Sequence, residues 1–210
     1  MLIHPLEVSH STAGRYIIGI DEVGRGALAG PLVVCACLVP VDILLQKYHE
    51  AWVDDVTDSK RIAKKKLPNL AERIKEQCLT WILQASSKDI DKAGIGVLNR
   101  KLVDEGIESV ISSVGTNQCH FLIDHVRASE EAHSYSAFPR ADSLCFSVAC
   151  ASIVAKCYRD ALMKNYSLAY PDYGWSTNVG YGTRDHIRAI KSHGLTKYHR
   201  RSFLKNITCV

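Results

Sequence analysis

The chain has 210 residues, 47% of them hydrophobic and 23% charged, and its net charge is +4. This length and composition allow a sizeable core in one domain over 1–210 and leave no room for a second domain with its linker. No run reaches the roughly 18 apolar residues of a membrane span, and the first residues, MLIHPLEVSHSTAG, lack the basic start and apolar run of a secretory signal. We expect a cytoplasmic protein.

Apolar runs alternate with segments of helical periodicity, which predicts an α/β protein. The expected strands cover 16–20, 31–40, 79–85 and 119–124. The expected helices cover about 63–77, 96–114, 143–165 and 183–193, with Gly194 ending the last one. Between these elements, 41–62 is rich in turn residues and 90–95 is predicted as a short connector.

The first expected strand ends in two adjacent acids, Asp21 and Glu22, and runs directly into a glycine-rich loop. Paired carboxylates are hard oxygen ligands that suit Mg²⁺ or Mn²⁺. Glycines let the backbone approach a phosphate or a sugar, and here an arginine lies among them: Gly24, Arg25, Gly26 and Gly30. The alternative is a solvated turn at a strand end.

Two further acids lie at the boundaries of expected elements. Asp124 ends an apolar strand, as Asp21 does, and strand ends in α/β sheets often carry ligand-binding groups. By itself, an isolated aspartate there favours an ordinary turn. Asp142 directly precedes the helix expected over 143–165, where an N-cap is its simplest role.

The basic residues are concentrated near the C-terminal end of the chain. Residues 184–210 carry seven basic residues and one acid, which leaves the rest of the chain at about −2. A basic C-terminal section on a near-neutral body is typical of a polyanion-binding face, although a solvated helix face would look the same.

Eight cysteines form no C-x-x-C pair and mostly lie in apolar runs, which indicates reduced, buried thiols rather than a zinc site.

The motif DEVGRG over 21–26, followed by LAGP over 28–31, resembles the signature of the type 2 ribonucleases H, specifically bacterial ribonuclease HII. The segment 142–160, with A-S-I-V-A-K and R-D, is similar to the helix of that family. The resemblance covers about 16–203 and reverses the simpler interpretations of Asp124 and Asp142. It implies a ribonuclease H-like mixed β-sheet flanked by helices (about 15–182), a helical basic C-terminal section (about 183–210), and four active-site acids: Asp21, Glu22, Asp124 and Asp142.

The same resemblance implies substrate contacts. The backbone of Gly24, Arg25 and Gly26 would hold the 2′-hydroxyl. Tyr181, in the segment that resembles G-Y-[GA]-T, would help to hold it and would stack on the next sugar. The D-S-K and H-R-R-S-F elements would hold phosphates through Ser59, Lys60, Arg200 and Arg201. From the residues alone, Tyr181 fits an interface aromatic equally well. Two departures from the family pattern, Ala27 for proline and Arg140-Ala141 for Lys-Gly, touch no expected ligand. At Arg140-Ala141 the loss of glycine predicts a locally different backbone.

Four carboxylates at one site repel one another unless cations neutralise them. We therefore expect cations there, and two Mg²⁺ or Mn²⁺ ions about 4 Å apart could activate a water and stabilise the leaving oxygen of a phosphodiester displacement. The family resemblance implies hydrolysis that leaves 3′-hydroxyl and 5′-phosphate ends, with an RNA–DNA hybrid or a DNA duplex containing ribonucleotides as substrate. Ribonuclease HIII is the nearest alternative, but only 20 residues precede Asp21, too few for its additional N-terminal domain. A non-catalytic nucleic-acid-binding protein would gain nothing from clustered acids. We expect a monomer; contact with a sliding clamp stays open.

Overall fold

The computed structural model describes residues 2–47, 50–115, 118–129 and 134–205, and in these residues five strands form one mixed sheet. The strand order is β3-β2-β1-β4-β5. β1 pairs antiparallel with β2 and parallel with β4, β3 adds antiparallel to β2, and β5 adds parallel to β4. The strands are β1 (Tyr16–Val23), β2 (Leu32–Val39), β3 (Leu79–Ala85), β4 (Cys119–Asp124) and β5 (Tyr135–Phe138). The predicted mixed sheet is confirmed.

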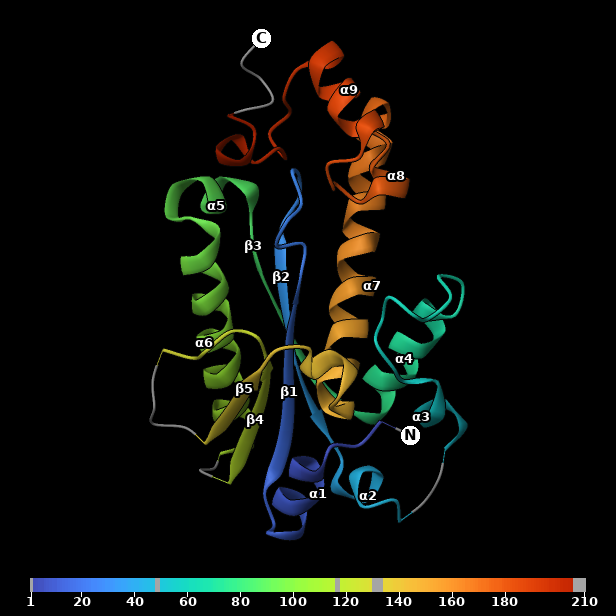
Figure 1. Ribbon diagram of the computed structural model, residues 1–210, viewed down its shortest axis with the longest axis vertical. Helices are drawn as coiled ribbons and strands as arrows, with labels where there is room; N and C mark the ends of the chain where they lie inside the picture. The colour runs from blue at the N-terminus through green and yellow to red at the C-terminus, as the bar shows by residue number, and fades with distance from the viewer. Residues whose placement is uncertain (1, 48–49, 116–117, 130–133, 206–210) are drawn as a thin grey trace.

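Helices cover both faces of the sheet (Figure 1). α7 (Phe146–Ala169) and α4 (Leu67–Gln77) pack on one face, and α6 (Ile95–Val114) packs on the other, next to α5 (Ser87–Ala93). Every residue of β2 is therefore buried: its odd-numbered residues join the core on the α7 side, and its even-numbered residues join the core on the α6 side. Burial on both faces explains why the β2 sequence is a continuous apolar run rather than an alternation.

The amino end of α7 lies directly against β1. A Cβ atom at Gly19 would collide with the backbone of Ser147, so this position of β1 requires glycine. The free amides at this helix end are satisfied by Glu7 of α1 (Pro5–Thr12): its carboxylate accepts from the Phe146 N–H at 3.0 Å and from the Ser147 N–H at 2.8 Å. The simple expectation that Asp142 caps this helix is therefore wrong. Asp142 lies in the short 3₁₀ turn η1 (Ala141–Ser143), which leaves its carboxylate free for other partners.

Several boundaries differ from the sequence prediction. The expected connector at 90–95 is mostly part of α5, whose Ser86–Asp89 capping box was readable in the sequence. α1 and β5 were not predicted, and the turn-rich stretch contains α2 (Val41–Leu44) and α3 (Ala51–Asp55). α4 begins at Leu67 rather than near 63, and α7 begins three residues later than expected and ends at Ala169.

The C-terminal section packs at the far end of α7 (Figure 1). It contains α9 (Arg184–His193) and η3 (Arg201–Phe203), and η2 (Pro171–Tyr173) and α8 (Trp175–Asn178) precede it. A separate apolar cluster that includes Met163 of α7, Trp175 and Ile190 joins this section to the body of the protein. None of the helices in the described ranges has the length and apolar composition that crossing a membrane requires.

Candidate active site

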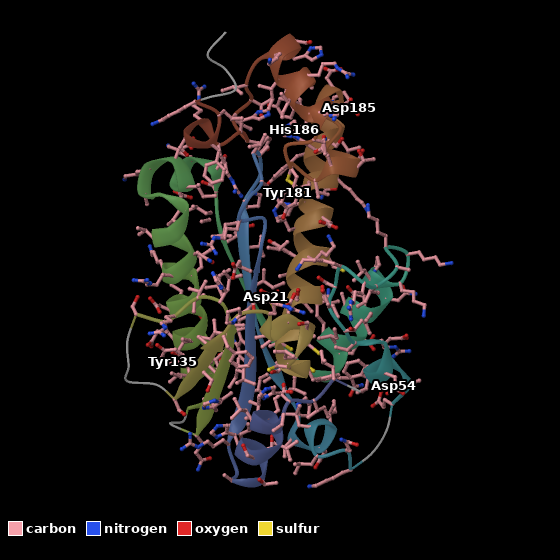
Figure 2. All side chains as sticks on the ribbon, viewed as in Figure 1. Asp21, Asp54, Tyr135, Tyr181, Asp185 and His186 are labelled. Atoms are coloured by element: carbon pink, nitrogen blue, oxygen red, sulfur yellow. The ribbon has the colours of Figure 1, made fainter. Side chains whose placement is uncertain are left out.

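The parallel pairing of β1 with β4 brings two of the predicted acids together. Ile20 pairs with Ile123, so Asp21 and Asp124, the next residue of each strand, lie side by side at one end of the sheet. Figure 2 shows Asp21 near the middle of the molecule, on the strand that α7 covers. Glu22 follows Asp21, and Asp142 reaches the same place from η1, so all four acids line one cavity.

This cavity has a volume of about 350 Å³ and is lined by ten of the twelve residues predicted to form the site. Those ten share no single element: they come from β1, the following loop, the 59–60 turn, the end of β4, η1 and the segment before α9. They are Asp21, Glu22, Gly24, Arg25, Gly26, Ser59, Lys60, Asp124, Asp142 and Tyr181. Ser152 and Lys156 of α7 also line the cavity.

Two of the four carboxylates, Asp124 at the end of β4 and Asp142 in η1, have polar partners nearby. An oxygen of Asp124 accepts from the Ala141 N–H at 2.7 Å, and an oxygen of Asp142 lies 3.4 Å from the ammonium of Lys60. The preceding residue, Arg140, has a φ of 64°, a left-handed conformation that glycine adopts more easily. Arg140 stands at the lysine position of the Lys-Gly pattern, so lysine would meet the same strain. Ala141 stands at the glycine position and lies in η1 without a positive φ, so η1 delivers Asp142 to the cavity without needing glycine there.

Burial and mutual repulsion dominate the electrostatics of these acids. The pKa of Asp21 is raised to about 8, mainly because its carboxyl is buried, with a further increase from the charges of Glu22 and Asp124. Burial also raises the pKa of Glu22 and of Asp124, and the charge of Asp124 adds to the effect at Glu22. The cations at the rim, Arg25 and Lys60, are largely exposed and compensate this only in part.

This donor set fits a divalent cation. The cavity offers carboxylate oxygens whose ionised forms are disfavoured until positive charge arrives, which is the chemistry of a Mg²⁺ or Mn²⁺ site. In the described part of the chain, no three histidine, cysteine, aspartate or glutamate side chains are already placed to hold a metal ion together. The acids therefore line the cavity as separate donors.

Two polar residues that the sequence did not single out contact the acids. Ser152 of α7 forms a hydrogen bond with Asp21 that lowers the carboxyl's pKa, and its hydroxyl lies 3.2 Å from that of Ser59. Asn99 of α6 is buried and lowers the pKa of Glu22, yet within the described residues neither of its amide atoms has a partner at full hydrogen-bond geometry. Ser152 lies within the A-S-I-V-A-K motif, which was the available signal. Asn99 had none.

The glycine-rich loop and Tyr181 line the same cavity. Gly24 has a φ of 86°, and a Cβ atom there would collide with the side chain of Arg159, so both the backbone and the packing require glycine. Tyr181 is 37% exposed and its ring lies beside the guanidinium of Arg159, 5.5 Å from ring centroid to Cζ. The ring lines the cavity and is not buried in an internal interface.

A buried histidine network holds the backbone of Tyr181. His186 Nε2 accepts from the Trp175 indole N–H at 3.0 Å, so its ring proton lies on Nδ1 and donates to the Tyr181 carbonyl at 2.9 Å. His199 Nε2 lies 3.2 Å from the same His186 nitrogen and therefore donates to it. Burial lowers the pKa of both histidines, that of His199 to about 4, so the network is neutral at pH 7.

The two arginines predicted from H-R-R-S-F differ in position. Arg201 is exposed, outside the cavity, and its backbone N–H donates to Asp91 at 2.9 Å. Arg200 is fully buried, and its guanidinium donates to the carbonyls of Arg25 and Gly30 at 2.9–3.0 Å. The expectation that the Arg200 side chain holds a phosphate is corrected: its hydrogen bonds are directed to the loop backbone, so it supports the loop from beneath.

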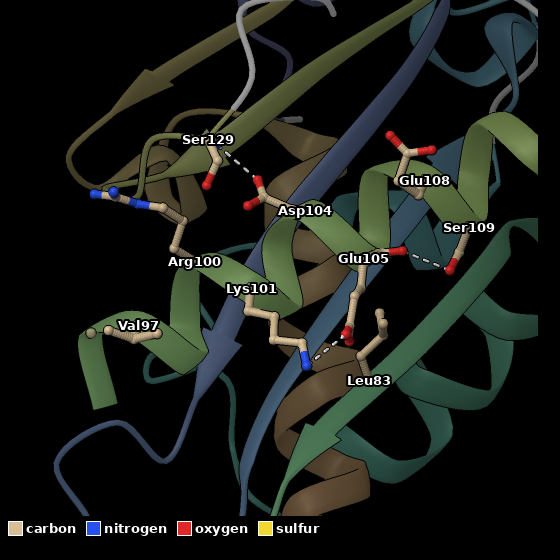
Figure 3. A pocket seen from close by; sticks show the side chains of 10 residues that line it. Leu83, Val97, Arg100, Lys101, Asp104, Glu105, Glu108, Ser109 and Ser129 are labelled. Atoms are coloured by element: carbon tan, nitrogen blue, oxygen red, sulfur yellow. Dashed lines mark hydrogen bonds and ion pairs between the residues drawn. The ribbon is translucent and has the colours of Figure 1, made fainter. Parts of the chain in front are cut away.

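A second hollow lies on the outer side of α6 (Figure 3). Three of its charged side chains have partners in the lining: Lys101 pairs with Glu105 at 3.5 Å, and Asp104 accepts from the Ser129 N–H at 2.9 Å. This hollow contains none of the predicted site residues. The cavity at the strand ends is therefore the candidate active site.

The fold has counterparts among solved structures. The ribonuclease HII of Archaeoglobus fulgidus, determined as a complex with PCNA, aligns with a TM-score of 0.69 and 24% identity over 88% of this chain and 93% of that one. Ribonuclease H2 of Pyrococcus horikoshii aligns with a TM-score of 0.69 and 21% identity over 91% and 96%. Bst-RNase HIII in complex with Mn²⁺ gives 0.67 and 19% over 95% and 73%. The architecture is therefore that of the ribonuclease H-like class.

Sequence comparison is more specific. The family model for ribonuclease HII matches residues 18–206. Ribonuclease HII of Clostridium acetobutylicum is 40% identical over 91% of this chain and 73% of its own length, and that of Synechococcus sp. is 38% identical over 90% and 81%. The chain belongs to the ribonuclease HII family. It is an endonuclease that cleaves RNA in RNA–DNA hybrids.

Proposed function

We propose that this endonuclease also cuts on the 5′ side of single ribonucleotides embedded in duplex DNA, by two-metal-ion hydrolysis that leaves 3′-hydroxyl and 5′-phosphate ends. The observation that carries the proposal is the shared cavity: four carboxylates, the Gly24–Gly26 loop and the ring of Tyr181 line one space of about 350 Å³. The acids that would cleave and the loop and ring that would recognise the ribonucleotide are therefore close enough to act on the same nucleotide. The roles that follow are removal of ribonucleotides from DNA and removal of RNA primers.

The metal centre would be held by Asp21, Glu22, Asp124 and Asp142. Bound Mg²⁺ or Mn²⁺ would supply an activated water and stabilise the leaving oxygen. Two features of the acids support this assignment. Asp21 and Asp124 lie at adjacent strand ends, and burial disfavours their ionised forms, which a bound cation would stabilise. A Mn²⁺ complex has been seen for Bst-RNase HIII. The donor types suit either ion.

Substrate recognition would be divided between the sugar and the phosphates. The backbone of Gly24, Arg25 and Gly26 faces the cavity and would bind the 2′-hydroxyl, with help from Tyr181. The Tyr181 ring would stack on the next sugar, where a deoxyribose leaves room. Ser59, Lys60, Arg201 and the exposed cations of α9 would hold backbone phosphates without reading sequence. The Ser59 hydroxyl also lies 3.2 Å from that of Ser152, which would place it near Asp21.

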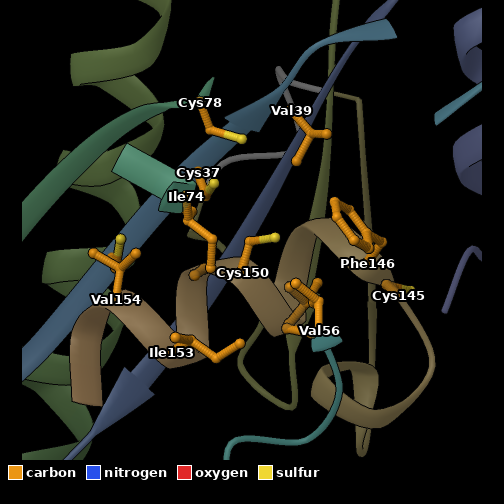
Figure 4. Packing of buried hydrophobic residues seen from close by; sticks show 14 of the residues in the cluster. Cys37, Val39, Val56, Ile74, Cys78, Cys145, Phe146, Cys150, Ile153 and Val154 are labelled. Atoms are coloured by element: carbon orange, nitrogen blue, oxygen red, sulfur yellow. The ribbon is translucent and has the colours of Figure 1, made fainter. Parts of the chain in front are cut away.

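The setting that best fits these features is a cytoplasmic, monomeric enzyme whose catalytic unit spans 1–210. The seven described cysteines are free, and six of them are buried. Figure 4 shows Cys37, Cys78 and Cys150 packed with Val39 and Ile74, where they act as small hydrophobic residues in a reducing compartment. The A. fulgidus relative binds PCNA; whether a clamp binds here rests on the chain end, and 206–210 lie outside the described residues.

Three matched, end-labelled duplexes test the proposal with Mg²⁺ or Mn²⁺: all DNA, DNA with one embedded ribonucleotide, and a full RNA–DNA hybrid. We expect a cut on the 5′ side of the lone ribonucleotide, cutting of the hybrid and no cutting of all-DNA duplex. Cutting of the hybrid alone would contradict the junction activity and the assignment of Tyr181. Cutting of all-DNA duplex would contradict recognition of the 2′-hydroxyl.

A further inference from the structure

Two buried arginines support the glycine-rich loop from below. Arg159 of α7 and Arg200 each have no exposed surface, which is unusual for arginine. Among the described residues, no carboxylate lies within ion-pair distance of either guanidinium. Burial lowers the pKa of both groups, and the neighbouring charge of Arg159 contributes to lowering that of Arg200 to about 10. Both groups are charged at pH 7.

The six hydrogen bonds of these arginines all go to backbone carbonyls. Arg159 donates to Ala29 at 3.0 Å, to Pro31 at 2.9 Å and to Val179 at 2.9 Å. Arg200 makes two bonds to Gly30, at 2.9 and 3.0 Å, and one to Arg25 at 2.9 Å. The three consecutive carbonyls of Ala29, Gly30 and Pro31 therefore accept from Arg159, Arg200 and Arg159 in turn.

This pattern connects separate parts of the proposed recognition machinery. Arg200 joins the start of the loop, at Arg25, to its end, at Gly30. Arg159 joins the end of the loop to Val179, two residues before Tyr181, and its guanidinium also lies beside the Tyr181 ring. The Arg159 side chain further forms the floor beneath Gly24, where a Cβ atom has no room.

We propose that Arg159 and Arg200 are positioning residues that fix the Gly24–Gly30 loop relative to Tyr181 and thereby set the preference for a lone ribonucleotide over a long hybrid. The inference rests on the proposed function, because it assigns the loop to the 2′-hydroxyl and Tyr181 to the following sugar. It adds a cause for their spacing: a rigid guanidinium fork that spans both segments.

Lysine substitutions separate the fork from the charge. Arg159→Lys and Arg200→Lys keep a cation but cannot hold several carbonyls in one plane. The measured quantity is kcat/KM for the single-ribonucleotide duplex divided by kcat/KM for the full hybrid. A misplacement of about 1 Å costs roughly a hundredfold in rate, so we expect the ratio to fall by about tenfold or more in each variant. The exposed Arg73→Lys of α4 is the matched control and should leave both rates unchanged.

Further readouts distinguish positioning from general damage. Mn²⁺ affinity, measured calorimetrically, should stay within about twofold of wild type, because neither arginine touches the acids. An unchanged ratio, including an equal fall of kcat/KM on both substrates, would overturn the inference while the proposed function stands. A wild type that cuts the hybrid but not the lone ribonucleotide would overturn both. If the variants do not fold, NMR of the wild-type protein provides the test. The signals of the Arg159 Nε–H and of Tyr181 should both shift when a ribonucleotide-containing duplex is added, and neither should shift with all-DNA duplex. The absence of a shift with either duplex would contradict the inference.

Discussion

At the ends of β1 and β4, carboxylates are buried beside one another with only exposed cations at the rim. Beneath the loop that follows β1, the guanidinium groups of Arg159 and Arg200 are buried, and among the described residues they donate hydrogen bonds only to backbone carbonyls. The acids line a cavity and need positive charge that the protein itself does not supply in full. The two guanidinium groups, in contrast, are fixed by hydrogen bonds to the backbone of the loop. The comparison supports both proposals, that the first region would bind the metal ions and that the second would fix the geometry of recognition.

The largest effect is expected from removing an acid. Asp21→Asn should lower the cleavage rate by about 10³-fold or more, because the neutral amide is a weaker ligand at the centre of the site. Single-turnover cleavage of the hybrid measures it, with Asp42→Asn on α2 as control. Retention of more than a tenth of the activity would remove Asp21 from the metal site.

The raised pKa of Asp21 makes the stability of the metal-free protein depend on pH. The folded-state pKa is about 8 against an ordinary value of 3.8, so the folded state binds more protons between these values and its free energy of unfolding falls as pH rises through that window. Melting temperatures in EDTA should therefore drop from pH 5 to pH 8 by more in wild type than in Asp21→Asn. Mn²⁺ should reverse the drop in wild type. A flat profile would contradict the picture of acids that lack positive charge.

Glu7 tests the scaffold rather than the chemistry. Glu7→Ala removes the carboxylate that caps α7 and leaves the Phe146 and Ser147 amides unpaired, which should cost about 3 kcal/mol of unfolding free energy. Urea unfolding measures it, with the exposed Glu72→Ala of α4 as control. Cleavage at a temperature where the variant is folded should change little. An equal loss in both variants would show that Glu7 is not a special cap.

The smallest effect is expected at the rim. Lys60→Met removes an exposed ammonium, so binding of every duplex should weaken only a few-fold and the slope of log affinity against log salt should decrease by about 1. Fluorescence anisotropy at several salt concentrations measures this, with Lys47→Met as control. A change confined to the ribonucleotide-containing duplex would instead place Lys60 in sugar recognition.

The same contrast separates what the sequence could predict from what it could not. Local patterns gave the strands that carry Asp21 and Asp124, because apolar runs ending in acids need no long-range information. β5 was missed because four half-buried residues leave a weak signal. Glu7 could not be predicted as the cap of α7 because it lies 139 residues before its partner Phe146. Arg159 and Arg200 have a residue type that predicts exposure, so their burial depends on a tertiary contact that no local pattern records.

The most direct test measures Mn²⁺ binding and ribonucleotide preference separately in two variants. Asp21→Asn should lose Mn²⁺ affinity at least tenfold while still binding the single-ribonucleotide duplex more tightly than all-DNA duplex. Arg200→Lys should keep its Mn²⁺ affinity while that binding preference declines. If each variant lost both properties to the same extent, the acidic cavity and the arginine-supported loop would be one inseparable unit, and the division of roles would be wrong.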